Sequence, residues 1–171
     1  MGVFPVKEVW EWVRSIAIAI ILALLIRFFI VEVFLVRGQS MYPTLENGER
    51  LIVNKFIYEF YEPDHEDIIV FQYTEEEDYI KRVIGVGEDE VKIKNNTVKR
   101  NGKPIEEDYL PENDMEDYGP VTVPSEHLFV LGDNRNSSKD SRHDAVGFVS
   151  LEEVKGKAFF VFWPLDNLRL L

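Results

Sequence analysis

Two residues of this sequence have the types and settings that nucleophilic catalysis requires: Ser40, which precedes a turn, and Lys81, which lies in an apolar run. Ser40 follows alternating apolar residues with the spacing of a strand, and Pro43 interrupts regular structure just after it. A serine at a strand end is accessible while a rigid sheet holds its backbone. Most serines beside turns only hydrogen-bond to nearby backbone, so Ser40 becomes a candidate nucleophile only together with a base.

Lys81 supplies the chemistry of such a base. It lies in a strand-like run with Ile80, Val83 and Ile84, where its side chain is expected to be buried. Burial disfavours the ammonium form and can lower the pKa of a lysine by several units, so that a neutral amine is available near neutral pH. A serine and a lysine of this kind form a known pair of nucleophile and general base.

A third stretch, residues 132–142, reads GDNRNSSKDSR and follows an apolar strand-like run. Together with residues 37–45 (RGQSMYPTL) and 78–85 (DYIKRVIG), it makes three motifs in order along the chain. In these motifs the chain closely resembles the bacterial type I signal peptidases. The resemblance extends from the apolar N-terminus to about residue 149, and three ordered motifs are far more specific than any one of them.

The resemblance implies roles for individual residues. Ser40 matches the nucleophile and Lys81 the general base of the family. Ser138 matches a serine thought to orient the lysine by a hydrogen bond, and Asp140 and Arg142 match residues that support the site. The side chains of Asp133, Asn134 and Arg135 could instead simply hold their loop by hydrogen bonds.

The resemblance also implies the reaction, in which a serine endopeptidase cleaves N-terminal signal peptides from exported preproteins after small residues. Ser40 would attack the peptide carbonyl, neutral Lys81 would take its proton and later activate water, and the Ser40 backbone N–H would bind the oxyanion. Some relatives add a serine hydroxyl two residues before the nucleophile; Gly38 stands there, so the second oxyanion donor is open. The substrate would lie extended along the preceding strand, which makes the expected binding residues Val33, Leu35, Arg37, Gly38, Gln39 and Met41.

Composition limits the other possibilities. With 171 residues, the chain is long enough for one compact domain plus an anchoring segment. It has no cysteine, and its three histidines are isolated, so we expect no disulfide, no metal and no cofactor. A net charge of -12 disfavours a nucleic-acid partner, because phosphate binding needs clustered lysine and arginine.

The N-terminal segment predicts membrane anchoring. Residues 10–31 are counted as a transmembrane helix, with Arg27 near one end able to reach the headgroups. Lys7 and Arg14 place residues 1–9 in the cytoplasm and residues 32–171 outside. A cleaved signal peptide is the alternative, but no small-x-small cleavage site follows the run. We therefore expect a single-pass protein of the plasma membrane, with preproteins and lipid as partners, beside the export machinery.

The rest of the chain predicts a mainly β fold with an antiparallel body. The resemblance implies that this body is signal peptidase-like, with coiled partial barrels. Short strand-like runs are separated by turn dipeptides, at Asn47-Gly48, Asn95-Asn96 and Asn101-Gly102. Ser150 begins a capping-box pattern, which predicts one short helix ended by Gly156. Residues 106–117 are acidic and rich in turn formers, so a solvated loop without an assigned role is expected.

Three alternatives remain open at this point. A Ser-His-Asp hydrolase could combine Ser40 with His65 or His143 and a carboxylate, but it would leave Lys81 unexplained. The Ser-Lys autoproteolytic repressors resemble the same β core, yet they carry a DNA-binding N-terminus where this chain has an apolar segment. A membrane-anchored β module without catalytic activity is the third.

Overall fold

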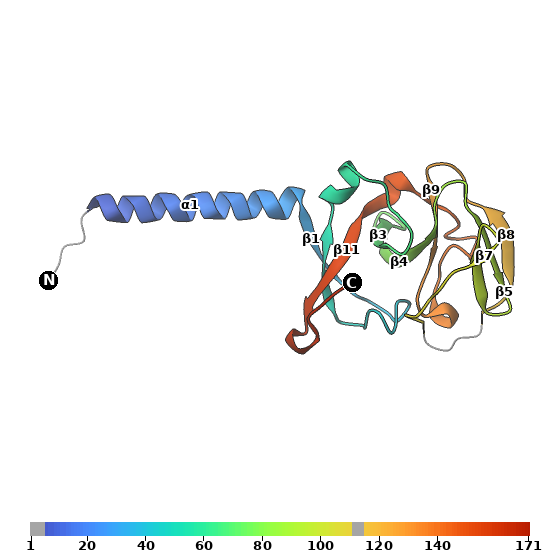
Figure 1. The fold of residues 1–171 in the computed structure, drawn as a ribbon. Coiled ribbons are helices and arrows are strands. Elements are labelled where there is room, and N and C mark those ends of the chain that lie inside the picture. The colour runs from blue at the N-terminus through green and yellow to red at the C-terminus, as the bar shows by residue number, and fades with distance from the viewer. Residues whose placement is uncertain (1–5, 111–114) are drawn as a thin grey trace.

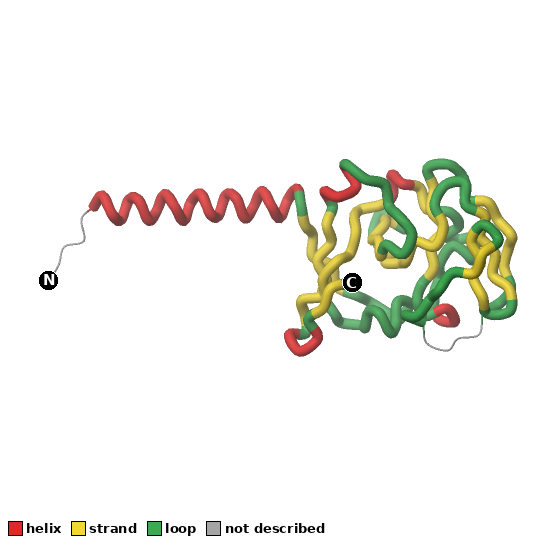
Figure 2. Tube along the Cα trace, in the orientation of Figure 1, coloured by secondary structure: helices red, strands yellow, loops and turns green. Residues whose placement is uncertain are grey.

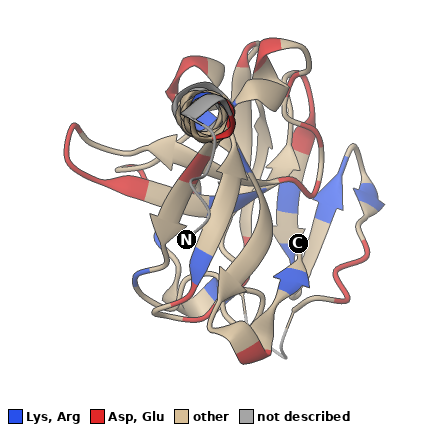
Figure 3. Cartoon of the chain, turned by 90° about the vertical axis from the view of Figure 1, so that its left-hand side faces the viewer, with Lys and Arg blue, Asp and Glu red and all other residues tan. Residues whose placement is uncertain are grey.

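The structure, a computed structural model, describes residues 6–110 and 115–171; at residues 6–7 and 25–29 it describes the backbone alone. Its first element is α1 (Val6–Phe29), a 24-residue helix that projects away from the body in Figure 1. The described side chains of this helix, from residue 8 to residue 24, are all exposed. Figure 3 looks along the helix and shows charged positions of both signs around the periphery of the body.

The helix differs from the expected element over residues 10–31. It starts four residues earlier, at Val6, because backbone hydrogen bonds form irrespective of the polarity of residues such as Glu8, and it ends before Val31, which opens a strand. Within the described residues no helix is long and apolar enough to cross a membrane, so the structure does not show the predicted transmembrane span. The side chains of Lys7 and Arg27, and most of the predicted cytoplasmic residues 1–9, lie outside what is described.

The body contains a main sheet of eight strands, all paired antiparallel (Figure 2). Its order is β1-β2-β11-β3-β4-β9-β10, with β12 paired to β11. The strands are β1 (Val31–Leu35), β2 (Arg50–Asn54), β3 (Ile68–Gln72), β4 (Asp78–Gly85), β9 (His127–Leu131), β10 (Val149–Ser150), β11 (Val154–Trp163) and β12 (Arg169–Leu170). Strands distant in sequence, such as β4 and β9, therefore become neighbours.

A smaller antiparallel sheet has the order β7-β6-β5-β8. Its strands are β5 (Glu90–Lys94), β6 (Thr97–Arg100), β7 (Lys103–Pro104) and β8 (Tyr118–Thr122). Asn95 and Asn96 join β5 to β6 with φ angles of 52° and 61°, as a tight hairpin turn of two left-handed residues requires. The prediction of a mainly antiparallel β fold is confirmed.

The apolar side chains form three buried clusters, one of them shared between the two sheets, and another contains residues of the first motif. Met41 and Leu45 pack there with Leu51 and Val53 of β2 and Val161 of β11, and all five are at most 2% exposed. Alternation of buried and less buried residues along β2 places this apolar face inward. The residues just after Ser40 are therefore anchored in the core.

The predicted helix after Ser150 is wrong in its extent. Ser150 and Glu153 do form the capping box, but around a single 3-10 turn, η3 (Leu151–Glu153), after which β11 starts at Val154. Gly156 does not end a helix; it lies within β11, where a Cβ atom would come within 2.5 Å of the Asn54 carbonyl oxygen. The glycine allows β11 and β2 to pack closely, and its position in the sequence does not reveal this role.

Candidate active site

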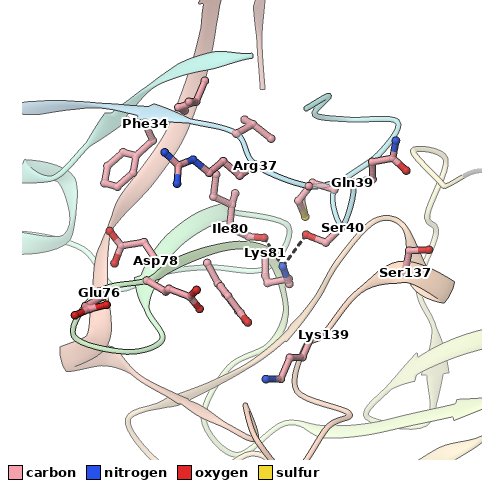
Figure 4. A pocket seen from close by; sticks show the side chains of 16 residues that line it. Phe34, Arg37, Gln39, Ser40, Glu76, Asp78, Ile80, Lys81, Ser137 and Lys139 are labelled. Atoms are coloured by element: carbon pink, nitrogen blue, oxygen red, sulfur yellow. Dashed lines mark hydrogen bonds between the residues drawn. The ribbon is translucent and has the colours of Figure 1, made fainter. Parts of the chain in front are cut away.

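The fold brings the two candidate catalytic residues into direct contact. Ser40 lies in the turn after β1, and Lys81 lies in β4, 41 residues further along the chain. Lys81 Nζ is 2.8 Å from Ser40 Oγ, and Figure 4 shows the two side chains pointing toward each other. Ser40 is half-buried at the edge of a cleft, so its hydroxyl can meet both the lysine and a substrate.

Lys81 is held in an environment that favours its neutral form. Its side chain is buried, and burial lowers the pKa of Lys81 to about 8, although Asp140 and Asp133 act in the opposite direction. Its second contact is the Ile80 carbonyl oxygen at 2.9 Å. A neutral amine there can donate to this carbonyl and still present its lone pair to the hydroxyl proton of Ser40.

The third motif packs against the backbone of the first. The Asn134 N–H donates a hydrogen bond of 3.0 Å to the Ser40 carbonyl oxygen. A Cβ atom on Gly132 would lie 2.4 Å from that same oxygen and 2.1 Å from Ser138 Oγ. Only a glycine allows the loop to approach this closely, so Gly132 sets the distance between Ser138 and the backbone of Ser40.

Asp140 and Arg142 form a buried ion pair within this loop. Arg142 donates through Nε and Nη2, both at 2.8 Å, to the two carboxylate oxygens, and the Gly132 N–H donates to Asp140 at 3.1 Å. Burial alone would raise the pKa of Asp140, but the hydrogen bonds and charge of Arg142 outweigh it and hold that pKa below its usual value. Asp140 is thus an anionic neighbour of the lysine.

Ser138 is placed in the site, although without the hydrogen bond that the resemblance implies. Its side chain is buried, and its hydroxyl lies close enough to Asp140 to help lower the pKa of that carboxyl. Lys81 bonds to Ser40 and Ile80 instead. The orienting role of Ser138 stays a prediction.

A cleft of about 540 Å³ opens beside the Ser40–Lys81 pair. Residues 34–41 form one wall, residues 76–81 form the other, and Ser137 and Lys139 complete the lining. Of the expected binding residues, the cleft is lined by Leu35, Arg37, Gly38, Gln39 and Met41. Val33 is not among the lining residues; it pairs with Ile52 of β2 and is more than half exposed.

Comparisons with known proteins identify the family. The family model described as signal peptidase, peptidase S26, matches residues 9–163. The chain belongs to this family. A protein named signal peptidase I from Bacillus amyloliquefaciens is 44% identical, over 94% of this chain and 88% of its own length. Signal peptidase I S from Bacillus subtilis (strain 168) is 42% identical, over 95% of this chain and 94% of its own length.

Among solved structures, this peptidase is similar to a signal peptidase I from Enterococcus faecalis V583. The two share 32% sequence identity with a TM-score of 0.49, over 57% of this chain and 97% of the other.

The peptidase also contains an ion pair at the site that sequence reasoning missed. Arg82 donates to both carboxylate oxygens of Asp133, at 2.9 and 2.6 Å, and Thr44 Oγ1 donates to the same carboxylate. These contacts tie the residue after Lys81 to the third motif and to the turn after Ser40. The hydrogen-bonding role considered for Asp133 is therefore observed. The only sequence signal for the ion pair of Arg82 and Asp133 is the position of this arginine directly after Lys81.

The histidine alternative finds no support at Ser40. His65 Nε2 lies 2.7 Å from Asp89, which also accepts from Asn101, at a site built from other strands. Within the described residues the only side chain bonded to Ser40 Oγ is that of Lys81. The same residues contain no group of three or more histidine, aspartate or glutamate side chains that could hold a metal ion.

Proposed function

We propose that this peptidase cleaves signal peptides from exported preproteins, with Ser40 as nucleophile and Lys81 as general base. The observation that carries the proposal is the 2.8 Å contact between the serine hydroxyl and a buried lysine whose pKa is about 8. Family membership supports the reaction class. The cleft beside the pair supplies room for an extended peptide.

The chemistry proceeds by acyl transfer. Neutral Lys81 accepts the proton of Ser40 as Oγ attacks the carbonyl carbon, and the resulting ammonium returns that proton to the leaving amine of the mature protein. This breaks the peptide bond and leaves the signal peptide esterified to Ser40. Lys81, neutral again, then takes a proton from water, whose oxygen attacks the ester carbon. The Lys81 ammonium returns this proton to the leaving Ser40 Oγ, which releases the signal peptide and restores both residues.

The oxyanion is bound by the backbone N–H of Ser40, which donates no hydrogen bond within the described residues. The Gly38 N–H is already engaged, because it donates to Asn47 Oδ1 at 2.9 Å. A glycine side chain offers no donor either, so a second donor would have to come from another residue.

Two unpaired strand edges accommodate the substrate backbone. β1 is the end strand of the main sheet, and β4 pairs with β9 only from Arg82 onward, which leaves one edge of residues 78–81 unpaired. Both segments line the cleft. An extended signal peptide can hydrogen-bond between them, while Leu35, Met41 and Ile80 limit the size of the side chains next to the scissile bond.

The ion pair of Asp140 and Arg142 keeps the third motif in place behind the dyad, and the Ser138 hydroxyl oxygen can accept a hydrogen bond from Lys81 as the ammonium forms. We assign the residues of this motif to support rather than to bond making.

Localisation to the plasma membrane is part of the proposal. The helix α1 carries apolar side chains that are exposed to solvent, among them Ile16, Ile20 and Leu24, and contact with lipid would remove them from water. With Lys7 and Arg14 on the cytoplasmic side, the body lies outside the cell, beside the export machinery.

We expect the full chain to pellet with membranes, and a chain starting at residue 34 not to do so. Equal fractionation of the two forms would refute the anchor.

The test of the reaction uses a preprotein substrate and an acylating probe of serine peptidases. Wild type should cleave the preprotein and be labelled, whereas Ser40→Ala should do neither. Ser137→Ala is the matched control, since it changes another serine of the same cleft and should still be labelled. Labelling of folded Ser40→Ala at the wild-type rate would remove Ser40 as the nucleophile.

A further inference from the structure

We propose that Glu107 and Tyr109 are positioning residues for the catalytic dyad, which hold the third motif against Ser40 through two buried arginines, Arg135 and Arg82. Both belong to the acidic segment that the sequence predicts to be a solvated loop. The inference rests on the proposed roles of Ser40 and Lys81. It assigns to residues 107–109 a function that their sequence alone does not indicate.

Glu107 acts through the buried Arg135. The guanidinium of Arg135 is 2% exposed and donates to Glu107 through Nη1 and Nη2, and the Glu107 side chain is itself only 8% exposed. The Nε of Arg135 donates to the Gly132 carbonyl oxygen at 3.0 Å. Gly132 is the residue whose close approach to the Ser40 carbonyl and to Ser138 sets the spacing of the site. Two residues, Arg135 and Gly132, thus connect Glu107 to the nucleophile.

Tyr109 connects the same segment to Arg82, the residue that follows Lys81. The guanidinium carbon of Arg82 lies 3.8 Å from the centre of the Tyr109 ring, close enough for a cation–π interaction. The Tyr109 hydroxyl donates to Glu107 at 3.0 Å, so the two residues hold one another. Arg82 directly follows Lys81 in the chain and donates hydrogen bonds to both carboxylate oxygens of Asp133 in the third motif.

The segment thus contacts two arginines, Arg135 and Arg82, and each arginine binds a residue of the third motif. Without the Glu107 carboxylate, Arg135 would keep a buried charge with no anionic partner, and its side chain would have to move toward solvent. Gly132 would then lose the donor that holds its carbonyl. Displacing catalytic groups by about 1 Å can cost on the order of a hundredfold in rate even when substrate still binds.

The neighbours of Glu107 provide matched controls. Glu106 and Asp108 carry the same charge in the same segment but are exposed. Glu106→Gln and Asp108→Asn therefore remove one negative charge without touching either arginine. A general effect of charge on substrate attraction would appear in these controls as well.

The experiment measures kcat and KM for preprotein cleavage by the full chain, at least 10 °C below the unfolding midpoint of each variant. We expect Glu107→Gln to lower kcat by about ten- to a hundredfold while KM changes less than about twofold, because bound substrate meets a misplaced nucleophile. Tyr109→Leu should lower kcat in the same way, and Tyr109→Phe less, because it keeps the ring over Arg82. The two control variants should match wild type.

If Glu107 and Tyr109 only stabilise the fold, their variants will have a lower unfolding midpoint but an unchanged kcat in the folded enzyme. That result would overturn the proposal. A rise in KM at constant kcat would also overturn it, since it would place the segment at the substrate. If Glu107→Gln does not fold, wild-type kcat in both Tyr109 variants decides against the proposal. These outcomes can be told apart from a failure of the proposed function. Preprotein cleavage by Ser40→Ala would refute the Ser40–Lys81 dyad itself.

Discussion

The two faces of strand β4 bury two adjacent cations in opposite ways. Lys81 is 3% exposed and Arg82 is 8% exposed, yet Lys81 meets a hydroxyl and a carbonyl, whereas Arg82 meets both oxygens of the Asp133 carboxylate. Burial lowers the pKa of Lys81 to about 8. Burial would lower the pKa of Arg82 too, but the hydrogen bonds and charge of Asp133 raise it.

The comparison shows that burial alone does not make a general base. A buried cation with a direct counter-ion stays charged and holds the structure together. A buried lysine without one loses its proton easily and is free for chemistry. Within the described residues no carboxylate forms a salt bridge with Lys81, so the difference lies in the partners and not in the depth of burial.

The largest effect is expected from a substitution that places a permanent cation at position 81. Lys81→Arg preserves the charge, but a guanidinium does not deprotonate in proteins and cannot accept the proton of Ser40. We expect the preprotein-cleavage rate to fall by about a thousandfold or more, close to the loss in Lys81→Ala. A rate within about tenfold of wild type, a loss of about 1.4 kcal/mol, would exclude Lys81 as the base.

On the opposite face, Asp133→Asn removes the counter-ion of Arg82. Breaking one partner of a buried ion pair typically costs about 3–5 kcal/mol, because the remaining charge is left without compensation. We expect a loss of unfolding free energy of about 3 kcal/mol, measured by urea denaturation. A loss below about 1 kcal/mol would mean that water or another group replaces the carboxylate at little cost.

The pH dependence of activity tests the state of Lys81 directly. Only the neutral amine accepts the proton, so kcat/KM should rise with pH and level off above the pKa of about 8. Asp133 and Asp140 favour the ammonium form, so Asp133→Asn should move this rise to lower pH. A profile that is flat between about pH 6 and pH 9, or a shift to higher pH in Asp133→Asn, would contradict the electrostatic account.

The smallest effect is expected at the exposed end of the same strand. Asp78, the first residue of β4, pairs with Lys155 at 2.7 Å, with side chains 25% and 36% exposed. Such partly exposed pairs contribute about 1 kcal/mol or less. Asp78→Asn should therefore change the unfolding free energy by less than about 1 kcal/mol. A cost as large as that of Asp133→Asn would show that solvent exposure does not explain the difference between the two pairs.

Much of the fold follows from local pattern. The paired asparagines at 95 and 96 and the capping box at Ser150 act within a few residues, and both local features are present as expected. Errors occur where a local signal has a distant cause. Gly156 marks the close approach of β11 to Asn54 rather than a helix end, and it is not a signal that neighbouring residues could explain.

The sequence by itself determined the chemistry of this protein: three ordered motifs with a serine, a lysine beside apolar residues, and a polar loop, which lead to the family and to the candidate dyad. The tertiary structure alone decided which buried charges meet. Arg82 with Asp133 and Arg135 with Glu107 are pairs of residues 51 and 28 positions apart. The reason is physical, since the register of β4 against β9 and the path of the acidic segment select these partners, and no local propensity encodes either one.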